Sequence, residues 1–598
     1  MTTNLNWDLD SIFPGGSQSA ALADFLQRLE TDIAAAERDG APPPLSAETE
    51  TPWRETLQHA FDLSARLAQA RSFASCLTAQ DVHDEPARLL VGRLGTLGAR
   101  LETHWNRLHA AAAEQPDEAW NRLLADDPLR PVAFLLNHYR ELARRKMPPD
   151  MESLATELAA DGYHAWNHLY GTLSGLKQVN FETDGQTVPL SLGQLQNKFT
   201  SDPDRDVRRR AFEAYTAAWQ ELAPACAMAL NHQAGFRLTL YRYRGWDSVL
   251  DEPLFNNRLR RETIDAMWGV IAAKSDRLLD YFAAKARLLG VDRLMWYDQN
   301  APVGNLARSL TFEEAADFIV ENFRAFDPAI ADFCRMAIER RWVEAEDRPG
   351  KRAGAFCTGF PLINQTRVFM TFGGTYDSMS TLAHELGHGY HNWTMRDLPF
   401  GARHYTMSVA ETASTFNELA VTDAALRAAR DDGERLSLLN QKLGDAVAFL
   451  MNIRARYDFE RAFFERRASG PLSEAELSAL MLEAQQNAYH HALADDGYHP
   501  LFWASKLHFY ITRSPFYNFP YTFGYLFSQG VYRRALAEGP AFSKRYVALL
   551  RDTGSMDTET LARTHLGVDL TRPDFWEETV DGVLSDVDTF VELANRAR

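Results

Sequence analysis

The feature that most constrains the fold of this chain is the short run His384-Glu385-Leu386-Gly387-His388. Residues four apart lie on one face of a helix, so both histidines point the same way if the run is helical. Two imidazoles at that spacing can share one zinc ion, and Glu385 is then placed to hold a water molecule on the metal and take its proton. The alternative is two solvated histidines beside an ordinary surface glutamate, because a motif match is only a hypothesis.

The residues around the motif predict a helix with one buried face. Asp377 or Ser378 can cap its start. Gly387 and Gly389 each cost about 1 kcal/mol relative to alanine inside a helix, so we expect another backbone or a ligand to come close there. His391 continues the stripe of motif histidines and could also reach a metal, but we favour a buried, hydrogen-bonded histidine. The apolar stripe at helical spacing consists of Leu382, Leu386, Tyr390 and Trp393.

A catalytic zinc site normally has three protein ligands and one position for water, so a third ligand must come from elsewhere in the chain. Glu411 is our candidate, because it lies at the start of a second predicted helix soon after the motif. Ser408 and Glu411 also fit a capping box, in which the glutamate only ties down the helix start. Glu418 follows two helical turns after Glu411 on the same face, and we expect it to hold a ligating histidine by its free ring N–H.

Three segments of this region resemble a known protease family. They are residues 368–375, residues 382–388 with the motif, and residues 411–418. Together they are similar to oligoendopeptidase F, within the thimet-oligopeptidase family of zinc metallopeptidases. The resemblance runs nearly end to end, and further similar segments lie at 7–14, 350–357, 503–510 and 516–526.

The resemblance implies a zinc site in which Glu385 is the general base. The residues that would bind the zinc ion are His384, His388 and Glu411. A later histidine and tyrosines near the C-terminus would reach the substrate and the developing oxyanion, to which imidazole and phenol groups can donate hydrogen bonds. The candidates are His508, Tyr517, Tyr521 and Tyr525. We prefer His508 and Tyr525, and the alternative for each tyrosine is a place in an aromatic core.

The composition is that of a globular protein with an acidic surface. Hydrophobic residues make up 45% and charged residues 24%, and the formal net charge is −18. Such a charge argues against non-specific binding of nucleic acids. The four cysteines are scattered without CxxC spacing, which is typical of reduced thiols. We find neither a signal peptide nor an apolar stretch of about 18 residues, so we expect a cytoplasmic protein that does not contact membranes.

Helical signals dominate, so we predict a mainly α fold. The predicted helices cover residues 20–37, 53–79, 86–114, 151–173, 206–241 and 261–289. Residues 179–181 and 187–190 predict a hairpin around a turn at Asp184 and Gly185. Residues 355–357 and 367–372 predict a second small sheet directly before the zinc-binding helix. Its edge could pair with an extended peptide, or the strands could pair only with each other.

The resemblance also implies a large two-lobed molecule with a deep central channel that excludes folded proteins. We divide the sequence into an N-terminal helical region, residues 1–190, and a zinc metallopeptidase catalytic region, residues 191–598.

The function that we favour is a zinc-dependent endopeptidase for short oligopeptides. Zinc would lower the pKa of its water to about 7, Glu385 would take the proton, and Tyr525 or His508 would hold the oxyanion. One alternative is a carboxypeptidase-like zinc exopeptidase, in which Arg367 or Arg513 caps the terminal carboxylate of the substrate. Another is a zinc-dependent peptide-binding protein without turnover, which would not need Glu385.

Overall fold

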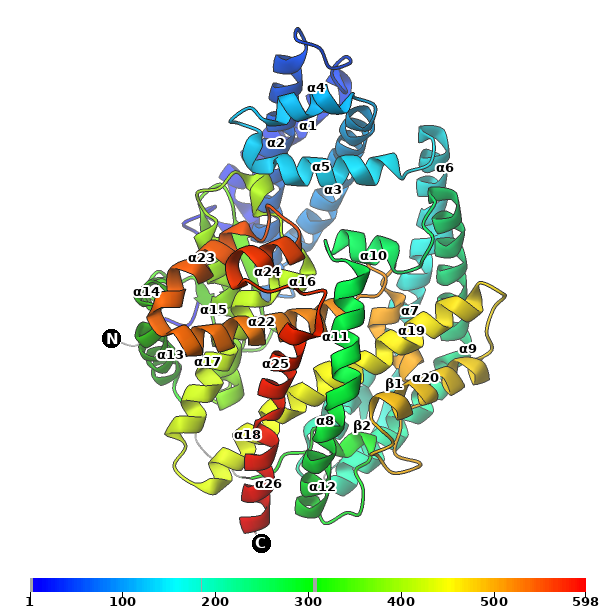
Figure 1. Ribbon diagram of the computed structural model, residues 1–598, viewed down its shortest axis with the longest axis vertical. Coiled ribbons are helices and arrows are strands. Elements are labelled where there is room, and N and C mark those ends of the chain that lie inside the picture. The colour runs from blue at the N-terminus through cyan, green and yellow to red at the C-terminus, as the bar shows by residue number, and fades with distance from the viewer. Residues whose placement is uncertain (1–3, 184, 305–308, 598) are drawn as a thin grey trace. The chain divides into compact units, whose positions relative to one another are not determined.

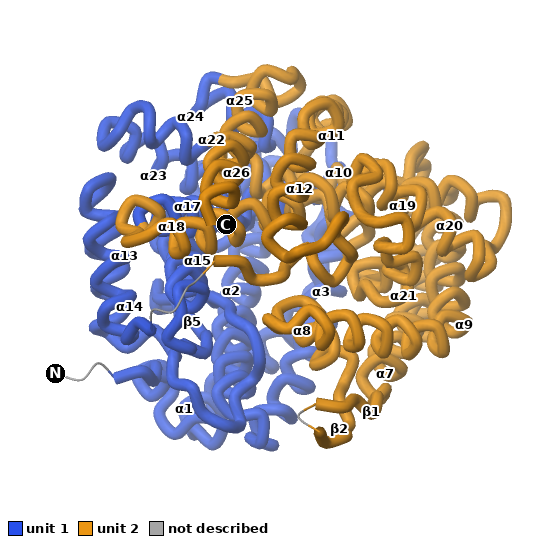
Figure 2. Tube along the Cα trace, turned by 90° about the horizontal axis from the view of Figure 1, so that it is seen from below, with its two compact units in different colours: residues 1–145, 308–424, 531–567 blue, residues 146–307, 425–530, 568–598 orange. Residues whose placement is uncertain are grey.

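The computed structural model describes residues 4–183, 185–304 and 309–597, and its elements are mainly helices, as predicted (Figure 1). The chain divides into two compact units, each built from three stretches of sequence (Figure 2). Unit 1 contains residues 1–145, 308–424 and 531–567, and unit 2 contains residues 146–307, 425–530 and 568–598. The boundary near residue 190 stays a prediction about how the sequence is organised.

Unit 1 contains a three-stranded sheet with the order β3-β5-β4. Strand β5 (Gln365–Phe369) pairs parallel with β3 (Val343–Glu344) and antiparallel with β4 (Phe356–Phe360). The helices of this unit are α1 (Ala20–Asp39), α2 (Glu50–Gln80), α3 (Glu85–Ala113), α4 (Asp117–Leu124), α5 (Ala133–Arg144), α13 (Phe312–Phe326), α14 (Pro328–Glu339), α15 (Tyr376–Thr394), α16 (Met407–Ala410), most of α17 (Thr412–Ala428), the end of α22 (Phe519–Glu538), α23 (Ser543–Asp552) and α24 (Thr558–Leu566).

The sheet lies directly before α15 and packs against it, which confirms the predicted sheet beside the motif helix. Its other contacts come from the N-terminal part of the chain, because α2 packs against both β4 and β5. Phe360 and Phe369 share one hydrophobic core with Leu63 and Phe73 of α2, and all four side chains are fully or almost fully buried. The N-terminal helices therefore support the strands that precede the motif.

Unit 2 contains the predicted hairpin, in which β1 (Gln178–Thr183) pairs antiparallel with β2 (Gln186–Ser191). Pro189 lies opposite Asn180 in this register, and the predicted turn residue Asp184 lies outside the described residues. The helices of unit 2 are α6 (Pro149–Ala159), α7 (Ala165–Leu176), α8 (Leu192–Ser201), α9 (Arg205–Arg244), α10 (Asp251–Asn256), α11 (Arg261–Lys274), α12 (Leu278–Leu289), α18 (Asp432–Val447), α19 (Ile453–Arg467), α20 (Glu474–Ala488), α21 (Phe502–Ser505), the start of α22, α25 (Pro573–Leu584) and α26 (Asp586–Arg596).

Local sequence explains where many helices begin and which face they bury. Helix α1 starts after Ser19, whose hydroxyl accepts a hydrogen bond from the N–H of Leu22. Leu22, Leu26, Leu29 and Ile33 then fall on one face at helical spacing and are all buried. Each such side chain contributes roughly 1.5–3 kcal/mol when it is removed from water.

Two predicted helices are interrupted. The segment predicted at 151–173 contains a π-helical turn at Ala160–His164 between α6 and α7. The segment predicted at 261–289 is broken by a 3-10 turn at Ser275–Arg277. The Ser275 side chain is buried, and its hydroxyl lies 2.9 Å from Nε2 of His490, so this break is fixed by a contact with a distant part of the chain. No helix within the described residues has the length and apolar character that crossing a membrane requires.

Candidate metal centre

Helix α15 begins with a cap that differs from the predicted one. The hydroxyl of Thr375 accepts a hydrogen bond from the N–H of Ser378 at 3.2 Å, which makes Thr375 the N-cap. Ser378 Oγ in turn accepts a hydrogen bond from the N–H of Gly373 at 3.0 Å. The prediction of Asp377 or Ser378 as the cap is wrong, because the chain bends at Gly374, which has a φ of 72°, and the next residue, Thr375, takes the capping position.

The two glycines of the motif helix mark places of close approach, as predicted. A Cβ atom on Gly387 would lie 2.5 Å from the carbonyl oxygen of Ala413 and 2.6 Å from Cα of Ser414. A Cβ atom on Gly389 would lie 3.0 Å from the ring of Phe333. Glycine at 387 therefore lets the first turn of α17 come directly against α15, and that turn follows Glu411.

Three side chains converge at this contact between α15 and α17. The Nε2 atoms of His384 and His388 lie 3.3 Å and 3.4 Å from the same oxygen of Glu411, Oε2. Their ring planes are inclined at 82°, and the ring centroids are 5.0 Å apart. One ligand atom from each residue lies within 4.8 Å of the other two. Within residues 4–183, 185–304 and 309–597, this is the one cluster of three His, Cys, Asp or Glu side chains that could hold a metal ion.

Glu411 lies between two helices, and it stands at the start of α17 as predicted, because its carbonyl oxygen accepts a hydrogen bond from the N–H of Thr415 at 3.0 Å. It is the residue that ends α16 and precedes α17, with φ of −85° and ψ of 4°. Its Oε2 atom, which lies beside both imidazoles, also accepts a hydrogen bond from Ser414 Oγ at 2.6 Å. This geometry is that of a carboxylate held toward the histidines, and it differs from the capping box that Ser408 and Glu411 could have formed.

The neighbouring polar residues separate into two roles. Glu418 Oε2 lies 3.1 Å from Nδ1 of His384, so the outer nitrogen of that ring is held by a carboxylate, as predicted. His391 is completely buried, stacks on Tyr405, and places its Nε2 3.1 Å from the carbonyl oxygen of Leu550. His391 is therefore the buried, hydrogen-bonded histidine that we favoured.

The pKa values of His388 and Glu411 put both side chains in the protonation states that bind a metal cation. Burial lowers the pKa of His384, but hydrogen bonds to Glu411 and Glu418 outweigh burial and raise that pKa to about 10. Burial lowers the pKa of His388 to about 4. Burial raises the pKa of Glu411, but the hydrogen bond to His384, the charges of both histidines and the hydrogen bond from Ser414 together outweigh burial and lower that pKa to about 2. Glu411 is thus a carboxylate and His388 a neutral ring, which are the forms that bind metals.

Glu385 lies on the same helix but is not part of the ligand cluster. Its side chain is buried, and burial raises its pKa to about 7. Its Oε2 atom has no hydrogen-bond partner among the described residues, which fits a carboxylate that faces a polar ligand. Two imidazoles and a carboxylate form the donor set of many catalytic zinc sites, so the residues present fit a zinc ion.

The predicted substrate residues of unit 2 form a second cluster. The ring centroid of His508 lies 5.5 Å from that of Tyr517 and 5.9 Å from that of Tyr521, and the two tyrosine rings meet edge to face. Tyr525 lies one turn after Tyr521 on α22, where it is buried and stacks on Phe449 with 4.3 Å between centroids. The structure thus groups His508 with Tyr517 and Tyr521, and it places Tyr525 against a different neighbour.

Hydrogen bonds define the orientation of the His508 ring. Asn518 Nδ2 donates to Glu460 Oε2 at 3.3 Å, so the other end of the amide, Oδ1, lies 2.9 Å from Nδ1 of His508. An amide oxygen only accepts hydrogen bonds, so the His508 proton is on Nδ1 and Nε2 carries a lone pair. Burial lowers the pKa of His508 to about 4, and the ring is neutral near pH 7.

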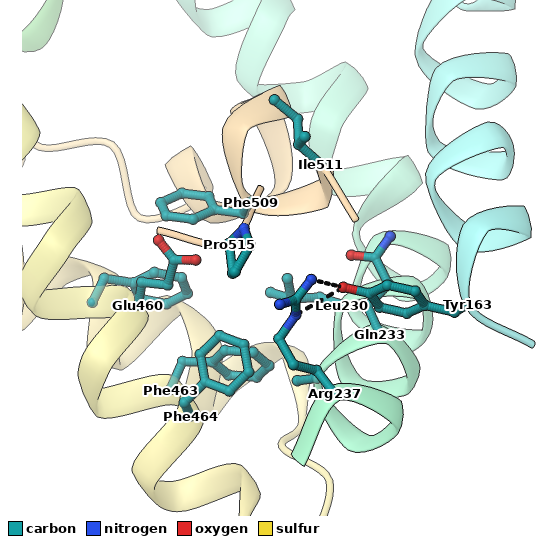
Figure 3. Close-up of a pocket in the computed structure, with 12 residues that line it drawn as sticks. Tyr163, Leu230, Gln233, Arg237, Glu460, Phe463, Phe464, Phe509, Ile511 and Pro515 are labelled. Carbon is teal, nitrogen blue, oxygen red and sulfur yellow. Dashed lines mark hydrogen bonds between the residues drawn. The ribbon is translucent and has the colours of Figure 1, made fainter. Parts of the chain in front are cut away.

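Glu460, which holds this amide, lines a small pocket within unit 2 (Figure 3). Figure 3 shows Arg237 hydrogen-bonded to the hydroxyl of Tyr163, and Arg237 also binds a carboxylate oxygen of Glu252 at 2.6 Å. Glu460 is buried, and burial raises its pKa to about 7. The sequence contained no local signal for Glu460 or Asn518, because their contact joins residues far apart in the chain.

Of the two arginines considered for an exopeptidase, the structure excludes Arg367 as a cap for a carboxylate and leaves Arg513 a prediction. Arg367 is completely buried in unit 1, and its guanidinium donates to the backbone oxygens of Asp8 and Thr366. This prediction for Arg367 is wrong, because strand β5 directs the side chain into the core. Arg513 of unit 2 is exposed. Arg456 and Lys506, which sequence reasoning missed, line a pocket in unit 2.

The chain is similar to known peptidases along most of its length. The sequence profile of peptidase family M3 matches residues 198–581, and the profile described as oligopeptidase F matches residues 113–176. An oligoendopeptidase F homolog of Lactococcus lactis is 26% identical over 70% of this chain and 69% of the relative. The group B oligopeptidase PepB of Streptococcus agalactiae is 26% identical over 86% of each chain. The crystal structure of oligoendopeptidase-F from Enterococcus faecium has the same fold, with a TM-score of 0.70, 19% identity, and coverage of 96% of this chain and 98% of that one.

Proposed function

The chain belongs to peptidase family M3, and we propose that it uses one zinc ion, held by His384, His388 and Glu411, to hydrolyse peptide bonds in short oligopeptides. Family membership makes the protein a metallo-oligopeptidase with endopeptidase activity. The observation that carries the finer assignment is the convergence of the three ligand atoms within 4.8 Å, beside a buried glutamate whose Oε2 lacks a partner among the described residues.

Glu385 is the proton carrier in this proposal. A bound zinc ion would supply Lewis acidity, which makes a water molecule acidic enough to react near neutral pH. Glu385 accepts the proton of that water and returns it to the leaving amine, and its raised pKa suits both transfers. Glu418 keeps the ring of His384 in one orientation through Nδ1, which leaves Nε2 directed toward the site.

We assign different roles to His508 and to the tyrosines. A neutral His508 with its proton on Nδ1 offers Nε2 as an acceptor, so it binds an N–H group of the peptide and does not donate to the oxyanion. The phenol groups of Tyr517, Tyr521 and Tyr525 remain the candidate donors to the oxyanion. Tyr525 is the first to test, because it shares a helix face with Tyr521 one turn away.

The cytoplasm is the location that we propose, and the four free cysteines support a reducing compartment.

Peptides with an internal fluorophore and quencher test the proposal. We expect cleavage at internal bonds, mapped by mass spectrometry, that a chelator abolishes and added zinc restores. Glu411→Ala should lose bound zinc, whereas Glu339→Ala, which changes an exposed glutamate of α14, should not. Release of single residues from the C-terminus only would indicate the exopeptidase alternative. Full zinc content and activity in Glu411→Ala would remove Glu411 from the ligand set.

A further inference from the structure

Unit 2 contains a second pocket, with an empty volume of about 810 Å³. Its wall carries basic side chains without acidic ones among the described lining residues. It is lined by α8, α9 and the end of α18, by the π-helical turn at Ala448–Asn452 with the following helix α19, and by side chains near residues 296–300 and 499–506 that do not include Asp298. Aromatic side chains cover much of the wall. They are Phe199, Tyr215, Trp296, Tyr297 and Phe502.

The charged residues on this wall are both cations. Arg456 of α19 and Lys506, which follows α21, line the pocket, and no Asp or Glu side chain does so among the described lining residues. The guanidinium carbon of Arg456 lies 5.3 Å from the centre of the Phe502 ring, and Lys506 Nζ lies 6.0 Å from the same centre. Two partly buried positive groups therefore lie against one ring.

The polar contacts of Arg456 are to neutral groups. Its Nε atom donates to Oδ1 of Asn452 at 2.8 Å. Its Nη1 atom comes within 3.4 Å of Nδ1 of His508 without a hydrogen bond, because the proton on that nitrogen donates to Asn518. Within the part of the chain that the structure describes, neither Arg456 nor Lys506 forms an ion pair with a carboxylate, whereas Arg454 and Arg461 of the same helix do. Asn452 therefore orients the guanidinium without neutralising it.

Other arginines of unit 2 form ion pairs with carboxylates, as expected of arginines that only stabilise the fold. Arg208 binds Asp298, Arg237 binds Glu252, and Arg244 binds Glu152, each through a carboxylate oxygen at 2.6–3.1 Å. A buried cation without such a partner lowers the stability of the fold, because it loses its hydration without gaining a counter-charge. Burial together with the charge of Arg456 lowers the pKa of Lys506 to about 7. In addition, the buried His499 on the same wall has an Nδ1 atom without a hydrogen-bond partner among the described residues.

We propose that this pocket binds a carboxylate group of the peptide substrate, with Arg456 as its main anchor and Lys506 beside it. A guanidinium offers a carboxylate paired, charge-assisted hydrogen bonds, and the aromatic wall accepts an apolar side chain next to that group. The contact between Arg456 and His508 places the carboxylate next to the residue that we assign to the peptide backbone. The identity of the ligand as a peptide rests on the proposed function.

Matched peptide pairs test the proposal and identify the source of the carboxylate. One pair has the same quenched peptide with a free C-terminus and with a C-terminal amide. The other pair is amidated and carries Glu or Gln near that end. We expect kcat/KM to be at least tenfold higher for the acidic member of one pair, mainly through KM, because charge-assisted hydrogen bonds are lost in the other member. Equal values within both pairs would overturn the inference while the endopeptidase activity stands.

Substitutions assign the effect to the pocket. Arg456→Gln should remove the preference by weakening only the acidic peptide, and Lys506→Gln should reduce it less. Arg461→Gln, which changes a more exposed arginine on the same helix, should leave the preference intact. An equal loss for both members of a pair in Arg456→Gln, at unchanged thermal stability, would show that Arg456 does not bind the carboxylate.

A binding experiment separates this inference from the proposed activity. The Glu385→Gln protein is titrated calorimetrically with the same peptides, and this readout needs no turnover. Tighter binding of the acidic member supports the pocket even if the wild type hydrolyses no peptide, an outcome that would overturn the proposed function instead. Equal affinities would overturn the carboxylate pocket. If Arg456→Gln fails to fold, the two wild-type peptide pairs still decide the question.

Discussion

Gly387→Ala tests whether the close contact between α15 and α17 positions the third metal ligand. The added Cβ would lie 2.5 Å from the carbonyl oxygen of Ala413, so that oxygen must move by about 0.8 Å to reach the ~3.3 Å of a close C···O contact. Glu411 lies two residues before Ala413 and would move with it. Metal sites tolerate shifts of only about 0.2 Å in ligand distance, so the affinity for zinc should fall.

The two energetic terms of this substitution have opposite signs. Alanine gains about 1 kcal/mol of helix propensity over glycine. Overpacking against a backbone costs roughly 1–3 kcal/mol or more, because the carbonyl of Ala413 cannot rotate away as a side chain can. We therefore expect the free energy of unfolding to fall by up to about 2 kcal/mol and the zinc affinity to fall at least tenfold, as it does when the support of a ligand is disturbed.

Gly389→Ala is the matched control on the same helix. Its Cβ would lie 3.0 Å from the Phe333 ring, which is a side chain and can shift. The propensity gain is the same, so we expect stability within about 1 kcal/mol of wild type and unchanged zinc affinity. Competition with a chromophoric chelator measures the affinity, and thermal unfolding with and without zinc measures stability. Wild-type zinc affinity in Gly387→Ala would refute the reasoning.

Three further predictions concern Glu385, Tyr525 and Glu460. Glu385→Gln should keep its zinc and lower kcat at least 10²-fold, the usual scale for loss of general acid–base catalysis, and turnover within a few-fold of wild type would remove Glu385 from the mechanism. Tyr525→Phe should lower kcat by roughly 10²–10³ with little change in KM if the phenol donates to the oxyanion; a lowered Tm with normal kcat would place Tyr525 in the core instead. Because burial raises the pKa of Glu460 from 4.5 to about 7, the protonated form is favoured on folding, and its stabilising contribution is complete below about pH 4.5 and lost as the pH rises through 7. The loss is on the order of 3 kcal/mol, and denaturant unfolding from pH 5 to 8 should show a smaller loss in Glu460→Gln; the same slope in both proteins would contradict the assignment.

Local patterns in the sequence determined much of this protein. Helical periodicity and capping residues are read over a few neighbouring positions, so the mainly helical fold, several of its long helices and the two antiparallel strand pairs could be predicted. Strand β3, which pairs parallel with β5, was missed, because its partner lies more than 20 residues further along the chain. The His384–His388 spacing requires only one helical turn. Gly387 predicted that another group comes close to this helix, but the sequence did not identify that group. Glu411 could be proposed because the donor chemistry of zinc leaves one ligand missing.

Only the tertiary structure decided which distant residues meet. The backbone at Ala413 is the neighbour of Gly387. The buried Arg367 side chain donates a hydrogen bond to the backbone oxygen of Asp8, which lies far from it in the sequence. Arg456 and Lys506 lie on separate segments, and the absence of a carboxylate beside them among the described residues is visible only after folding. Periodicity records which face of an element is buried, but the choice of partner depends on contacts between residues far apart in the chain, and a single sequence carries no local signal for those contacts.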